Sequence, residues 1–114
     1  MRTAHVVYDN RKAGLLTELE DGRFKFQYDS DYLKINKPHY QLRINFGLEL
    51  QKEPYYSDSM FIEFENLLPE GQFREKLCHA QGLDVNDSMG LLVIYGAGMP
   101  DGLIVAGDIK KALR

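Results

Sequence analysis

The sequence lacks several features that would assign it to a special class. One cysteine, Cys78, in 114 residues excludes an internal disulfide and favours a reducing, cytoplasmic environment. There is no apolar run of about 18 residues and no charged-then-apolar leader after Met1, so we expect neither a membrane span nor a secretion signal. Because nucleic-acid binding needs a basic patch, the net charge of -3 makes direct nucleic-acid binding unexpected.

Patterns for zinc binding and nucleophilic catalysis are also missing. His5, His39 and His79 share no ligand spacing with one another or with Cys78, so we expect no zinc site. Cys78 follows a leucine and has no evident histidine partner, which favours a packing thiol over a nucleophile.

Two polar segments imitate ligand-binding loops without completing them. Residues 84–88 match the first three ligand positions of a calcium loop, but Met89 stands where that loop requires glycine, so we interpret the segment as a helix cap. The glycines of residues 96–102 lack the Gly-Lys-Ser/Thr end of a P-loop, and a strand begins at Leu103. We therefore favour a turn there, and we predict no metal, no cofactor and no catalytic residue.

The residues that are present form an ordinary globular composition, with 44% hydrophobic and 27% charged residues. We expect one domain over residues 1–114, long enough to bury roughly two-thirds of its unfolded surface.

The first part of the chain predicts antiparallel strands. Residues 3–8 and 13–19 are apolar segments separated by polar residues and predict a hairpin. Asp21-Gly22 favours a type I′ turn, which needs positive φ at both central positions. Residues 24–28 alternate strictly and place three aromatic rings on one face, so we expect these rings in the core.

The segments that follow mix helix and strand signals. We expect a helical turn over residues 29–35 and a loop over residues 36–39. Residues 42–50 alternate apolar and polar side chains and give the clearest strand pattern, with Gly47 at a bulge or bend.

The last part of the chain leaves one choice open. Residues 84–87 can cap a third helix, but periodicity equally permits a buried strand over residues 91–95. A loop over residues 96–102, a strand over residues 103–106 and a short basic tail, which could be helical, complete the chain.

Residues 57–82 carry the most informative pattern. Starting at Met60, apolar residues recur at helical spacing, Ser57 to Ser59 offer capping acceptors, and Pro69 cannot continue a helix, so we predict a helix from about Ser59 to Leu68. After a turn at residues 69–71, the helical period resumes with Phe73, Lys76, Leu77 and Ala80 and ends at Gly82. We call the bend, residues 67–73, the elbow.

The run FIEFENLLPEG (residues 61–71), followed by REKL (residues 74–77), resembles the amino-terminal domain of HipA-like toxin kinases. In that family a phenylalanine-rich helix ends in an asparagine, two leucines, a proline and an acidic residue. The resemblance extends to the hairpin, where the matching residues are Gly14, Leu16, Asp21-Gly22, Phe24 and Tyr28. Residues 45–50 depart from it, since two serines and a proline of the family are replaced, and residues 96–106 are altered.

The resemblance favours helix over strand before the glycine turn. Together with the patterns above, it implies an α+β fold, a small curved mostly antiparallel sheet with two to three helices packed on one side. The family's kinase residues lie after this domain, and this sequence has none of them, so we expect no phosphorylation by this chain.

The elbow has two interpretations. In the first, Leu67, Leu68 and Phe73 close the core. In the second, the residues of a projecting corner bind a partner; these are Glu70, Gly71, Gln72 and Phe73. Many relatives have a bulky aromatic directly after the Pro-Glu-Gly turn, whereas this chain has Gln72 there and Phe73 next.

The resemblance also implies a function and partners. In some HipA-like systems this domain is a separate small antitoxin, HipS, which binds the toxin kinase HipT. We therefore expect an antitoxin that binds a HipT-like kinase in a complex with a HipB-like DNA-binding protein. The alternatives are an N-terminal fragment of a full-length HipA-like kinase toxin, and a small-ligand domain that uses the Gly96 to Gly102 loop.

Overall fold

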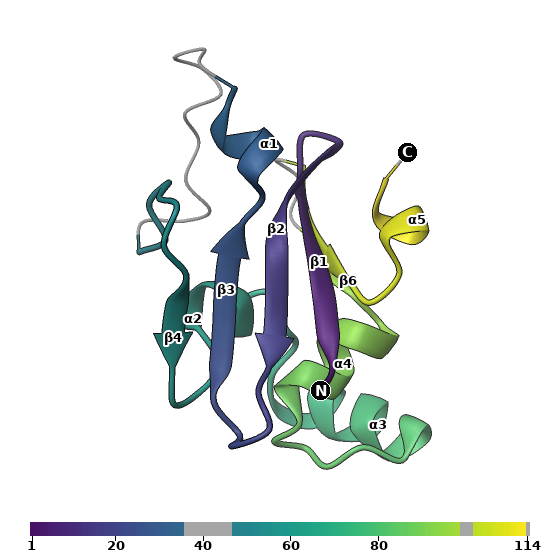
Figure 1. Ribbon diagram of the computed structural model, residues 1–114. Coiled ribbons are helices and arrows are strands. Elements are labelled where there is room, and N and C mark those ends of the chain that lie inside the picture. The colour runs from purple at the N-terminus through teal and green to yellow at the C-terminus, as the bar shows by residue number, and fades with distance from the viewer. Residues whose placement is uncertain (36–46, 99–101, 114) are drawn as a thin grey trace.

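The computed structural model describes residues 1–35, 47–98 and 102–113. A six-stranded sheet has the order β4-β3-β2-β1-β6-β5, and every neighbouring pair is antiparallel (Figure 1). Its strands are β1 (Thr3–Tyr8), β2 (Arg11–Glu18), β3 (Phe24–Tyr28), β4 (Tyr55–Ser57), β5 (Ala97–Gly98) and β6 (Leu103–Ala106). The helices are α1 (Ser30–Leu33), α2 (Ile62–Glu65), α3 (Gly71–Gln81), α4 (Ser88–Ile94) and α5 (Ile109–Ala112). The predicted small antiparallel α+β fold is confirmed.

Helices α2 and α4 lie on the rear face of the sheet in the view of Figure 1. Helix α4 contacts β1 and β6. Helix α3 lies at the lower end of the molecule, beyond the ends of the strands, and the elbow between α2 and α3 is therefore away from the middle of the sheet (Figure 1).

The core between the sheet and α2 is aromatic. Phe26 of β3 and Phe64 of α2 are fully buried, and their ring centroids are 5.4 Å apart in an edge-to-face arrangement. Phe26 makes a second edge contact with Tyr28, at 4.9 Å. The prediction that the rings of residues 24–28 lie in the core is confirmed for Phe26 and Tyr28, while Phe24 is half-buried and packs against the core.

The turn prediction at Asp21-Gly22 is wrong in type. Gly22 has positive φ (88°), but the residues with two successive positive φ values are Asp9 and Asn10, at 50° and 59°. Because β1 and β2 pair up to Tyr8 and Arg11, only Asp9 and Asn10 are left to turn the chain, and a two-residue turn of this kind needs both in the left-handed region. The loop after β2 is longer and needs one such residue.

The strand predicted over residues 42–50 is not continuous in its described part. Residues 42–46 lie outside the described residues; Leu48 forms a single bridge, and Glu49 and Leu50 are not in a strand. The hydroxyls of Tyr28 and Tyr55 donate to the carbonyls of Leu48 and Glu49, so two side-chain hydrogen bonds hold this segment in addition to the bridge at Leu48. The paired strand β4, which follows Pro54, was not predicted.

The open choice near residue 91 is decided in favour of helix, since α4 spans Ser88–Ile94. Residues 96–102 were predicted to be a loop, but Ala97–Gly98 pairs with β6 as strand β5. Residues 99–101 lie outside the described residues. The basic tail contains a short helix, α5.

Candidate protein-docking surface

Helix α2 is shorter than predicted. It starts after Phe61, which is its N-cap residue and has no side-chain acceptor, so the capping predicted for Ser57 to Ser59 is wrong. The helix also ends earlier than predicted, at Glu65 instead of Leu68, and a turn covers the residues between its end and Pro69. In this tighter turn the amides of Leu67 and Leu68 donate to carbonyls three residues earlier, at 3.1 and 3.0 Å.

Helix α3 ends where predicted and starts at the last residue of the predicted turn. It begins at Gly71, which has φ 63°, and ends at Gly82, which has φ 68°. The amide of Leu83 donates to the carbonyl of Cys78 at 2.8 Å, the bond that closes a helix end with a left-handed glycine. Both ends of the helix are therefore fixed by glycines in conformations that other residues rarely adopt.

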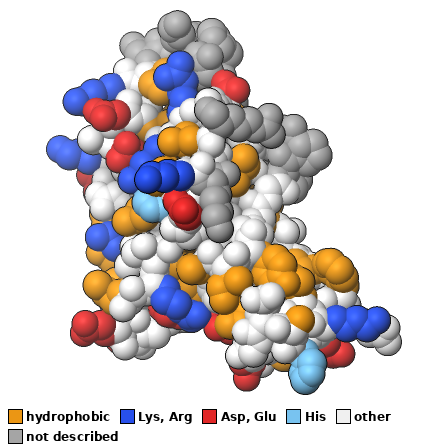
Figure 2. Space-filling view, turned by 90° about the vertical axis from the view of Figure 1, so that its right-hand side faces the viewer, with side chains coloured by type: hydrophobic (Ala, Val, Ile, Leu, Met, Phe, Trp, Pro, Cys, Tyr) orange, Lys and Arg blue, Asp and Glu red, His pale blue; other side chains and the backbone are white. Residues whose placement is uncertain are grey.

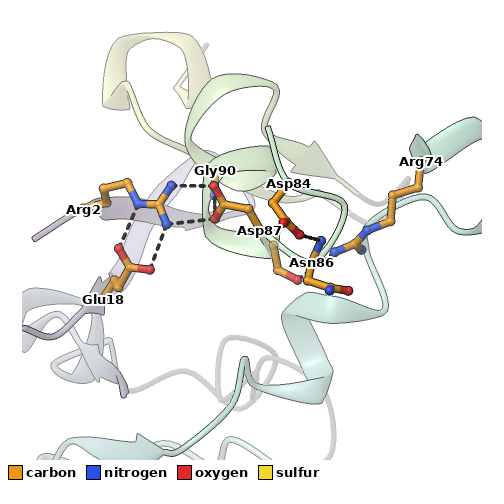
Figure 3. Close-up of polar contacts among 8 residues, drawn as sticks. Arg2, Glu18, Arg74, Asp84, Asn86, Asp87 and Gly90 are labelled. Atoms are coloured by element: carbon orange, nitrogen blue, oxygen red, sulfur yellow. Dashed lines mark hydrogen bonds and ion pairs between the residues drawn. The ribbon is translucent and has the colours of Figure 1, made fainter. Parts of the chain in front are cut away.

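Arg74 fixes the position of α3. Its side chain is only 11% exposed, and it donates to the carbonyl of Val85 at 2.7 Å, to Oγ of Ser88 at 3.0 Å and to Oε1 of Glu65 at 3.3 Å. These partners belong to α2, to α4 and to the segment before α4, which the arginine approaches in Figure 3. One side chain therefore joins the elements on both sides of the elbow.

The hydrogen bonds of Arg74 determine which face of α3 is buried, and this face differs from the one that the sequence pattern indicates. The helical period predicted from the sequence consists of Phe73, Lys76, Leu77 and Ala80. In the structure Leu77 is half-buried and packs against the core, but the most buried residues of the helix are Cys78 and Arg74. Phe73 is 65% exposed and Ala80 is exposed. The interpretation that Phe73 closes the core is therefore wrong, although Leu68, which is 6% exposed, does close it.

Phe73 stands beside a small apolar pocket. The pocket has a volume of about 220 Å³ and lies between the elbow, α3 and the C-terminal end of α4; its lining residues are Leu68, Pro69, Phe73, Leu77, Leu91, Tyr95 and Gly96. Tyr95 is 45% exposed. Figure 2 shows hydrophobic side chains gathered over this projecting lower part of the molecule. The candidate surface thus combines the elbow with the end of α4.

The four predicted partner-binding residues lie together at this surface. Glu70, Gly71 and Gln72 are exposed and immediately precede the exposed Phe73. Their role in binding stays a prediction. Sequence reasoning missed Arg74 and Tyr95; the available signal was the i, i+4 spacing of Arg74 and Cys78 on a helix face.

A second polar cluster fixes the start of α4. Arg2 donates to both carboxylate oxygens of Glu18, each at 2.8 Å, and to both of Asp87, at 2.9 and 2.8 Å (Figure 3). Asp87 also accepts the amide of Gly90 at 3.0 Å, which confirms the predicted cap. The hydrogen bonds from Arg2 lower the pKa of Glu18 and the pKa of Asp87. The same bonds raise the pKa of Arg2, and the bond to Glu18 contributes the most to this rise. The cluster ties α4 to β2 and to the N-terminus.

The other candidate sites have structural roles where they are described. Cys78 is buried, as the packing interpretation predicted. Ala97 and Gly98 pair with Val105 and Ile104 instead of opening a phosphate loop. Within the described ranges no group of three or more His, Cys, Asp or Glu side chains could hold a metal ion. No helix in that same part of the chain is long and apolar enough to cross a membrane.

Comparison with known proteins identifies the family. The model of the family described as HipA N-terminal domain matches residues 4–104. This chain belongs to that family. An uncharacterized protein of Haemophilus influenzae is 32% identical to it over 99 residues, which cover 87% of this chain and 86% of that protein. The solved N-terminal domain of HipA toxin matches with a TM-score of 0.64 and 29% identity, over 95% of this chain and 93% of that one.

Family membership supports a toxin–antitoxin context for this chain. The matched part of HipA is its non-catalytic N-terminal domain, and the match includes the hairpin, the elbow and α4. The resemblance noted in the sequence is thus confirmed over most of the chain.

Proposed function

We propose that this chain is a HipS-like antitoxin that binds a HipT-like kinase toxin through the elbow and neutralises it, within a complex that also contains a HipB-like DNA-binding protein. The proposed contact residues are Glu70, Gly71, Gln72 and Phe73. The observation that supports this proposal most directly is the 65% exposure of Phe73 on a helix that Arg74 joins by hydrogen bonds to Glu65, Val85 and Ser88.

The geometry of the elbow suits a docking role. An exposed aromatic ring contributes the most to binding when it fills a pocket and is fully desolvated. Arg74, Gly71 and Gly82 already fix the helix that carries Phe73, so little further ordering is needed on binding. The adjoining apolar pocket would let a partner side chain pack against the same ring.

A second candidate function is that the chain is an N-terminal domain of a full-length HipA-like kinase toxin. The match over 93% of the solved N-terminal domain of HipA toxin favours it. The two candidates differ in whether the chain acts on a kinase as a separate polypeptide. A separate downstream kinase reading frame would support the antitoxin, and an uninterrupted frame past Arg114 would support the toxin domain.

The test is co-expression of the chain with a HipT-like kinase encoded beside it, with growth rescue and co-purification as readouts. We expect the wild-type chain to restore growth and to co-purify with the kinase. The double variant Gln72→Ala/Phe73→Ala should lose most of both. Lys76→Ala, at an exposed position on the same helix, is the matched control and should behave as wild type.

The circular dichroism spectrum and the thermal midpoint of each variant must match those of the wild type before rescue is compared. Full rescue by a folded double variant would move the interface away from the elbow. Failure of the wild-type chain to rescue growth or to bind the kinase would contradict the antitoxin proposal itself.

A further inference from the structure

A second groove borders α2 and shares no lining residue with the pocket beside Phe73. Its volume is about 500 Å³, and it is formed by the end of the β2–β3 hairpin, the start of α2 and the start of α4. The residues that line it are Glu18, Phe24, Ser59, Met60, Ile62, Glu65, Asn86, Asp87, Ser88 and Met89.

Four of the ten residues that line this groove are apolar. Met89 is buried, and Phe24 and Met60 are half-buried and pack against the core. Ile62 projects from the outer face of α2 and is 62% exposed. A large aliphatic side chain exposed next to a hollow gives an incoming apolar side chain a surface to cover.

The surroundings of the groove are strongly acidic. The three segments that form it, residues 18–24, 57–66 and 84–90, contain eight Asp or Glu residues and one basic residue, Arg23. Arg2 and Arg74 offset part of this charge through their ion pairs. An excess of five negative charges remains, although the whole chain has a net charge of -3, so the rest of the chain is net positive. Three of the eight acidic residues, Glu18, Glu65 and Asp87, line the groove itself.

The carboxylate of Glu65 is only partly satisfied. Its Oε1 accepts from Arg74 at 3.3 Å, while Oε2 is buried and has no hydrogen-bond partner among the described residues. A carboxylate has acceptor capacity for more than one such donor. The Glu65 side chain lines the groove and is 36% exposed, so a guanidinium or ammonium group in the groove would approach its exposed part and not the buried Oε2.

We infer that this groove is a second docking site, independent of the elbow, for a partner protein segment that carries arginine or lysine next to a branched apolar side chain. The acidic residues of the groove favour the arginine or lysine of the partner by charge complementarity. Ile62 and the other apolar lining residues favour the branched apolar side chain next to it. The inference does not depend on the identity of the kinase or on the role of Phe73.

The test is a titration of the isotope-labelled full chain, followed by amide chemical shifts, with two capped hexapeptides. The probe is Gly-Arg-Leu-Arg-Leu-Gly, and the matched control replaces both arginines with glutamate. We expect saturable shifts at residues 60–65 and 86–89 with the arginine peptide only. Because this contact is partly ionic, raising the salt from about 0.05 to about 0.5 M should weaken binding.

Variants separate the groove from the elbow. Ile62→Ser removes exposed apolar surface and should weaken binding about tenfold, whereas Glu65→Gln, which keeps an acceptor for Arg74, should weaken it about threefold. Phe73→Ala should leave peptide binding unchanged. The inference would be overturned by any of four results. These are equal binding of the glutamate peptide, shifts centred on the elbow, no saturable binding of the arginine peptide, or unchanged peptide binding by the Ile62→Ser variant.

Discussion

Two phenylalanines, Phe26 in strand β3 and Phe73 in helix α3, differ in how far they are buried. Phe26 in the sheet was predicted to lie in the core, and for Phe73 in the helical part both a core and an exposed position were left open; Phe26 is fully buried and Phe73 is 65% exposed. Strand β3 is paired on both sides, and its register with β2 places Phe26 opposite the buried Leu16. Helix α3 lies beyond the end of the sheet, and there the hydrogen bonds of Arg74 decide which face turns inward. Apolar periodicity is thus decisive where strands fix the register and weaker where polar contacts set the orientation.

The largest expected effect tests the aromatic half of this comparison. Phe64→Ala removes a fully buried ring that contacts both Phe26 and Phe61, and it should lower the free energy of unfolding by about 3–5 kcal/mol. Phe73→Ala is the matched control and should change it by less than about 0.5 kcal/mol. Urea denaturation of the two variants measures both values. Similar losses in the two variants would show that the two rings are not in different environments.

The next largest effect tests the polar contacts that set the orientation of α3. Arg74→Ala leaves the side chains of Glu65 and Ser88 without their donor, and we expect a loss of about 2 kcal/mol in the free energy of unfolding. Lys76→Ala, two positions along the same helix and exposed, should cost less than about 0.5 kcal/mol. In the first variant, amide hydrogen exchange should also speed up in α3 more than in β2. Exchange that rises equally in both elements would mean that Arg74 supports the whole fold and not the elbow in particular.

Several features could be predicted because local chemistry determines them. The alternation of residues 24–28 gave a strand with a buried face, Asp87 gave a helix cap, and Gly82 ended α3 in the left-handed conformation. Pro69 likewise set the place of the bend. Each of these depends on a period or on a backbone preference that neighbouring residues alone specify.

Other features depend on contacts between distant parts of the chain. Residues 47–50 have a strand pattern, but the hydroxyls of Tyr28 and Tyr55 donate hydrogen bonds to the carbonyls of Leu48 and Glu49. The exposure of Phe73 follows from bonds that Arg74 makes to Val85 and Ser88, more than ten residues away. The candidate docking residues could therefore be placed at the bend from the sequence, but the choice between a buried and an exposed Phe73, and the pocket beside it, could not be derived from it.

The smallest effect concerns the link between the two regions, where Arg2 joins Glu18 of β2 to Asp87 at the start of α4. Arg2 is 40% exposed, so Arg2→Met should cost only about 1 kcal/mol of stability at pH 7. Its bonds lower the pKa of Glu18 and Asp87 below their ordinary values of 4.5 and 3.8. Between the ordinary and the lowered pKa values the unfolded chain binds more protons than the folded one, so this stabilisation is complete above about pH 5 and is lost as the pH falls through the lowered values. Urea denaturation at pH 7, 5 and 3 should show the wild-type and variant curves converging in acid. The control is Lys34→Met, which removes an exposed ion pair with Asp31 and should show no such convergence. If the stability difference between wild type and Arg2→Met stays constant with pH, the Arg2 side chain stabilises the contact between β2 and α4 by packing and not by charge.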